Sequence, residues 1–200
     1  LQNVANDEER YKLTCNLFNE YMPYKSDSAA KYIYEAILLA EKKGNKSQLC
    51  HTRSLLAFLC SSTGQYVESK RILDSTDISG VDREALGQFY KSLAHVYGEM
   101  AYYSNIPKLK NEFFAKQDEY TEKIYEILPP SHDFYLQRKE QECYKKGDIE
   151  GALRYNDKRL ENVSPDSHEF AIVAFYRFMD LHKAGKTQEA MAWLAKSAIC

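Results

Sequence analysis

The sequence predicts an all-α fold built from about five antiparallel helix hairpins. Apolar residues recur at spacings of three and four over most of the 200 residues, and no segment alternates apolar and polar residues long enough to form a convincing strand. A short pattern also recurs. In it, a large and a small residue lie before a Gly turn, and a larger residue and a second small residue follow the turn. Because one such hairpin cannot bury its own apolar face, the pattern implies neighbours of the same kind.

The clearest copy of the pattern spans residues 56–70. Ala57 and Ser69 are small where two antiparallel helices must approach closely, and larger residues beside them fill the groove between the helices. Gly64 can take the left-handed backbone conformation that ends the first helix. This stretch therefore predicts a tight helix–turn–helix.

Further copies lie at residues 147–153 and 185–191, and residues 93–97 repeat the large-small-x-x-Tyr core without the tight turn. Together the copies resemble tetratricopeptide (TPR) repeats. The resemblance implies a right-handed superhelix in which a single domain, residues 1–200, binds partners on its concave side. TPR arrays are scaffolds, so the resemblance alone does not identify a ligand.

We expect the hairpins at about residues 6–44, 46–74, 82–128, 131–161 and 165–199. Pro23 stops the first helix, and Asp27 or Ser28 can cap the second. Pro107 interrupts the third hairpin, and Ser131 can cap the helix after the two prolines that precede it. The third hairpin exceeds about 34 residues, the usual length of a TPR repeat, so it is expected to be irregular.

Composition excludes some classes of function. A net charge of -2 gives no basic footprint for nucleic acid and no polybasic anchor, and no run of about eighteen apolar residues could cross a membrane. We therefore expect no direct nucleic-acid binding and no membrane insertion by this region. The chain begins at Leu1 without Met, so we expect a processed or trimmed start.

The five cysteines are odd in number and widely spaced, which favours unpaired thiols at helix-packing positions. Cys50 and Cys60 would lie roughly 15 Å apart along one helix, too far for a bridge. The others are Cys15, Cys143 and Cys200.

No sequence motif indicates an enzyme, a cofactor or a metal. Neither phosphate-binding Gly pattern is present, and the five histidines never pair at a spacing of four. A metal site assembled from distant helices stays open. Carboxylate pairs such as Asp118 with Glu119, or Glu140 with Glu142, are interpreted as solvated helix faces.

Three strings, at residues 128–131, 164–172 and 194–199, resemble the sensor-like portion of TPR regulatory proteins from the Bacteroidetes. The resemblance implies an exported TPR region of a membrane-anchored transcriptional regulator, and hence a periplasmic location. Unpaired cysteines favour a reducing compartment instead, so the location stays open.

The expected binding surface is the inner wall formed by the first helix of each hairpin. It offers mixed polar and aromatic residues, without the Lys and Arg cluster that would hold a terminal carboxylate. We expect a protein or peptide partner there. The candidate residues are His51, Ser54, Phe58, Gln88, Lys91, His95, Phe134, Gln137, Gln141, Ile172, Phe175 and Met179.

The alternative is a structural role, in which the domain associates with itself and the inner wall binds no ligand. Trp193, Leu194 and Ile199 would leave an apolar end that favours such a contact.

Overall fold

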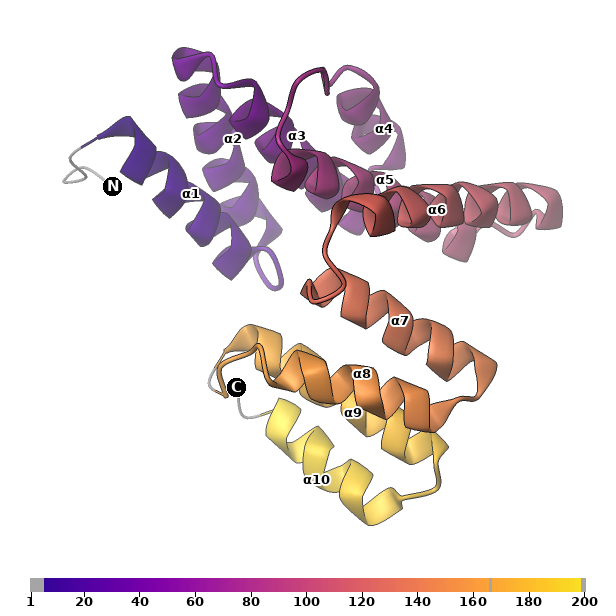
Figure 1. Cartoon of the computed structure of the whole chain (residues 1–200). Coiled ribbons are helices and arrows are strands. Elements are labelled where there is room, and N and C mark those ends of the chain that lie inside the picture. Colours follow the sequence, from indigo (N-terminus) through magenta and orange to yellow (C-terminus); the bar gives the residue numbers. More distant parts are fainter. Residues whose placement is uncertain (1–5, 166, 199–200) are drawn as a thin grey trace. The chain divides into compact units, whose positions relative to one another are not determined.

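The computed structural model describes residues 6–165 and 167–198, which form ten α-helices and no strand (Figure 1). The predicted all-α class is confirmed. The helices are α1 (Asp7–Tyr21), α2 (Ser26–Lys43), α3 (Lys46–Ser62), α4 (Tyr66–Asp74), α5 (Arg83–Tyr103), α6 (Pro107–Ile127), α7 (Asp133–Lys146), α8 (Ile149–Leu160), α9 (His168–Lys183) and α10 (Thr187–Ser197).

The chain divides into two compact units, and each is described by itself. Unit 1, Leu1–Leu128, contains α1 to α6, and unit 2, Pro129–Cys200, contains α7 to α10. Within each unit consecutive helices pack as hairpins, which can be followed in Figure 1. One continuous repeat domain over both units stays a prediction.

Glycine ends helices at the predicted turns. Gly64 and Gly147 have φ values of +81° and +80°, in the left-handed region that residues with a Cβ rarely adopt. The amide of Asp148 then donates to the Cys143 carbonyl at 2.9 Å, and that of Gln65 to the Cys60 carbonyl at 2.8 Å. These bonds satisfy carbonyls that the helix end would leave unpaired.

Three expected helix boundaries are wrong by one or two residues. Pro107 is the first residue of α6 rather than an interruption, because the first turn of a helix needs no amide hydrogen there. The second helix, α2, begins at Ser26, before both expected caps. His132 rather than Ser131 caps α7, since its Nδ1 accepts from the Phe134 amide at 3.1 Å.

The core of unit 1 is a continuous apolar cluster. Helix α3 runs through it and contributes buried residues on several faces, including Leu55, Leu56 and Leu59. The predicted close approach of α3 and α4 is present, and the Ser69 hydroxyl donates to the Ala57 carbonyl at 2.8 Å. The other main contributors are Phe18, Ile33, Ala36, Ile37, Leu73, Phe89, Leu93 and Val96.

The core of unit 2 mixes apolar and charged side chains. Leu136, Val173 and Leu181 are buried beside Glu140 and Arg159, which are each only 1% exposed. The interpretation of Glu140 as part of a solvated helix face is therefore wrong. Sequence spacing did not reveal its partner, since Arg159 lies on the next helix.

The four cysteines in the described residues are free thiols. Cys50 and Cys60 are buried, and burial raises the pKa of the half-buried Cys15 thiol to about 11, so that thiol stays protonated at neutral pH. Cys200 and Ile199 lie outside the described residues. Among the helices that the structure describes, none is long and apolar enough to cross a membrane.

Candidate functional site

Two of the predicted residues meet on the neighbouring helices α3 and α5. The rings of Phe58 and His95 stack with centroids 4.0 Å apart and an interplanar angle of 20°. The Nε2 atom of His95 lies 3.0 Å from the Ser62 hydroxyl. Burial lowers the pKa of His95 to about 4, so the imidazole is neutral at physiological pH. The pair therefore presents an uncharged aromatic surface, and both rings are only half-buried.

Ser54 lies behind this surface. It is fully buried, and its hydroxyl donates to the Cys50 carbonyl at 2.7 Å. Its own carbonyl accepts from the Ser92 hydroxyl at 2.7 Å, and Gln88 donates to the same Ser92 hydroxyl at 3.4 Å. Ser54 thus ties α3 to α5 and offers no side-chain surface to a partner. Lys91, on the same helix as Gln88, is half-buried.

A cavity of about 560 Å³ opens between α1, α3 and the start of α5, and His51 lies in its wall. Three first helices of consecutive hairpins thus contribute to one concave site inside unit 1. The lining residues are Tyr11, Lys12, Cys15, Asn16, Asn19, Asn45, Ser47, Gln48, His51, Asp82, Glu84 and Ala85.

Helix caps hold part of the cavity wall in place. The Asn45 side chain accepts from the Gln48 amide at 3.1 Å, and the Asp82 side chain accepts from the Ala85 amide at 2.8 Å. The amide of Asp82 donates to the Ser47 hydroxyl at 2.9 Å, which joins the starts of α3 and α5. These polar groups are engaged within the chain, so the wall is preformed.

The residues that line the cavity on its α1 side were not predicted from the sequence. Lys12, Asn16 and Asn19 follow at spacings of four and three, which places them on one helix face. All three are exposed, and the side chains of Asn16 and Asn19 make no hydrogen bond within the part of the chain that the structure describes. The sequence reasoning followed only the apolar stripe of this helix, although the polar stripe beside it was an available signal.

Charges of both signs surround His51. Its pKa is lowered, first by burial and then by Lys91, while Glu84 and Asp82 act in the opposite direction. The ring is therefore neutral near pH 7 and offers one donor and one acceptor. The lining thus combines Lys12 with two carboxylates, Asp82 and Glu84.

Unit 2 carries the other predicted residues: Phe134, Gln137 and Gln141 on α7, and Ile172, Phe175 and Met179 on α9. The Gln141 amide donates to the Tyr176 hydroxyl at 2.9 Å, which links the two helices. Ile172 is 39% exposed and Phe175 45% exposed. These six residues lie in unit 2 and line no part of the cavity between α1, α3 and α5.

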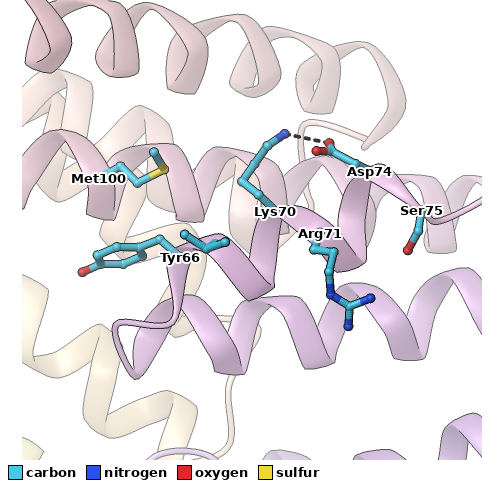
Figure 2. A pocket seen from close by; sticks show the side chains of 7 residues that line it. Tyr66, Lys70, Arg71, Asp74, Ser75 and Met100 are labelled. Carbon is cyan, nitrogen blue, oxygen red and sulfur yellow. Dashed lines mark hydrogen bonds and ion pairs between the residues drawn. The ribbon is translucent and has the colours of Figure 1, made fainter.

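A second hollow of about 630 Å³ lies between α4 and α5 (Figure 2). Figure 2 shows Tyr66 and Met100 at one end and the Lys70–Asp74 ion pair, 2.8 Å long, at the other. Val67 on its rim is 87% exposed. The sequence reasoning treated this side only as hairpin packing and predicted no surface there.

Comparison with protein families assigns the fold. A family model described as the SusR N-terminal TPR domain matches residues 1–200. The chain belongs to the SusR N-terminal TPR domain family. The SusR regulators are Bacteroidetes proteins, so both resemblances seen in the sequence are confirmed. No curated protein and no solved structure gives a match to this SusR-type TPR domain. TPR domains are generally non-catalytic scaffolds that mediate protein interactions.

Proposed function

We propose that this SusR-type TPR domain binds an extended peptide segment of a partner protein on the inner face of unit 1. The observation that carries the proposal is the preformed cavity between α1, α3 and α5, with the Phe58–His95 pair farther along the same two helices α3 and α5. The first helices of three hairpins supply the cavity, which is where TPR-type folds present their concave surface.

The polar groups of the cavity suit a peptide main chain. Each amide side chain of Asn16 and Asn19 carries a donor and an acceptor, as a peptide group does. The two residues lie three apart on α1, so their side chains project from the same helix face. A partner segment along α1 could use both amides without needing a charge of either sign.

The aromatic pair suits an apolar side chain of the same segment. Because Phe58 and a neutral His95 are only half-buried, a partner residue that covers them removes apolar surface from water. The burial of one such side chain is worth about 1.5–3 kcal/mol. We therefore propose a segment that combines an exposed main chain with one apolar anchor.

In the larger regulatory protein, we propose that this domain is the sensory or interaction part. Occupation of the inner face would be passed to other segments of the protein through the stacked hairpins. Membership in a family of regulators supports this role, as does the scaffold character of the fold.

The test is selection of peptides from a displayed random library against the 200-residue chain, followed by affinity measurements. We expect Asn16→Ala with Asn19→Ala, and separately Phe58→Ala, to weaken the selected peptide about tenfold or more, since each removes direct contacts. Val67→Ala on α4 is the matched control because it removes an exposed apolar side chain outside the cavity. Equal affinities for all variants would refute the proposal.

Self-association is the second candidate, favoured by the exposed Ile172 and Phe175 on unit 2. The chain end gives it less support than the sequence suggested, because Trp193 is covered by Arg177 and Lys196 at 5.0 and 4.0 Å from its ring centroid. Light scattering separates the two candidates: a dimer that becomes monomeric on Ile172→Ala with Phe175→Ala supports self-association, and a concentration-independent monomer excludes it.

A further inference from the structure

Unit 2 seals four polar side chains away from water. Glu140 on α7, Asn156 and Arg159 on α8 and Asp180 on α9 are each at most 2% exposed. Buried ionised groups are stable only where partners replace the water that they lose. The hydrogen bonds of the cluster therefore show which of these groups can carry a charge.

Glu140 is fully engaged. One carboxylate oxygen accepts from the Asn156 amide at 2.8 Å, and the other accepts from the Arg159 guanidinium at 2.6 Å. Asn156 also donates to the Val173 carbonyl at 3.0 Å, which connects the cluster to α9. Glu140 thus has the partners of an ionised carboxylate.

Asp180 lacks such partners. Its Oδ2 atom is buried without a hydrogen bond from any donor in the described residues. The carboxyl group that faces it is Glu140, which lies within hydrogen-bonding reach. A carboxylate cannot donate, so two ionised carboxylates cannot form this bond; it requires a proton on one of them.

The two arginines whose charges act on Asp180, Arg159 and Arg177, have other partners. On α8, Arg159 also pairs with the half-exposed Asp133 on α7, at 2.7 Å. On α9, Arg177 is directed to Asn156 and Asp157. The cations therefore have other carboxylates to neutralise.

The charged groups of α10 are engaged elsewhere. Glu189 lies near Lys186, and Lys196 lies over the Trp193 ring. Lys183, the remaining cation of the last turn of α9, donates to the Tyr144 carbonyl.

We propose that Glu140 and Asp180 share one proton at mildly acidic pH, and that loss of this proton as the pH rises loosens the packing of α9 in unit 2. The buried hydrogen-bonded cluster carries the proposal, because a proton between the two carboxyl groups gives the orphaned Oδ2 atom of Asp180 a hydrogen bond. The proton is held by the two like-charged groups together, as in other close carboxyl pairs.

The direction of the pH effect follows from linkage. Burial, and then Glu140, raise the pKa of Asp180 from 3.8 to about 7. A group whose pKa is higher in the folded chain stabilises that chain at low pH, and this stabilisation is lost as pH rises towards the folded value. Unit 2 should therefore weaken between about pH 4 and pH 7 and change little above pH 7.

The single Trp of the chain allows the pH-dependent loss of stability to be measured within unit 2. Trp193 packs beside Arg177 and Phe170, so its fluorescence during denaturation follows unit 2 alone. We expect the folding equilibrium constant of the wild type, relative to that of Asp180→Asn, to fall up to about tenfold for each pH unit between pH 5 and pH 7 and then to level off. Glu189→Gln is the matched control, because this exposed carboxylate of the same unit pairs with Lys186 and with no arginine of the cluster. It should keep the wild-type pH dependence.

A spectroscopic measurement decides the matter if Asp180→Asn does not fold. At pH 6 ordinary carboxyl groups are ionised. The wild type and Glu189→Gln should nevertheless show the infrared carbonyl band of one protonated carboxyl group, which disappears with a midpoint near pH 7. Absence of that band at pH 6, or a wild-type to Asp180→Asn ratio that stays constant from pH 5 to pH 8, overturns the proposal.

Discussion

Both units of this chain are built from antiparallel helix hairpins, but they stabilise them differently. Unit 1 is held by an apolar cluster that includes Phe18, Ile33, Leu56 and Phe89. Unit 2 buries fewer large apolar residues and places a Glu–Arg–Asp network between its helices. The same repeat architecture thus accommodates an apolar core and a charged one.

The difference matters because the two kinds of core respond to different conditions. Apolar burial is non-directional and involves no titrating group, so it does not change with pH. A buried ion pair contributes only while every partner is present and correctly protonated. The apolar cluster of unit 1 should therefore support the binding cavity independently of single charges, whereas unit 2 should respond to single charge changes.

The largest effect is expected for Arg159→Met, which leaves Glu140 as a buried charge without its cation. Removal of one partner of a buried pair costs about 3–5 kcal/mol. Trp193 fluorescence during urea denaturation should show this loss in unit 2, while hydrogen exchange of α3 and α5 stays unchanged. Arg71→Met, at an exposed pair with Glu68, is the control and should have no measurable effect.

A comparable but pH-independent loss is expected for Leu93→Ala in unit 1. Leu93 is 4% exposed in the apolar cluster, so its truncation creates a cavity and costs about 2–5 kcal/mol. Hydrogen exchange of α5 measures the loss. A loss that changes between pH 5 and pH 8 would contradict the view that Leu93 contributes apolar packing alone.

How much of the structure could be predicted from the sequence depends on whether the interacting residues are close together in the chain. The roles of Gly64, Ala57 and Ser69 could be predicted because a helical hairpin is specified by neighbours in sequence. The ion pair of Glu140 with Arg159 could not be predicted, since it depends on how two separate helices face each other. The cavity was anticipated only through His51, because the pattern of α1 was read for its apolar stripe and not for Asn16.

The smallest effect is expected where the two units are alike. Gly64 in unit 1 and Gly147 in unit 2 have nearly equal positive φ values, and a Cβ at either would meet no atom within 4 Å. Each Gly→Ala change should therefore cost only the backbone strain, about 1–2 kcal/mol. Equal losses of the unfolding free energy at both turns would confirm that the cores, not the turns, distinguish the units.

The most direct test of the central claim, that the inner face of unit 1 binds a partner segment, is to locate a bound peptide. A peptide selected against the chain, and carrying a photoreactive residue, would be cross-linked and its attachment sites mapped by mass spectrometry. Cross-links to α1, α3 and α5 around Asn16, His51 and Phe58 are the predicted result. Cross-links confined to unit 2 or to the hollow between α4 and α5 would contradict the account.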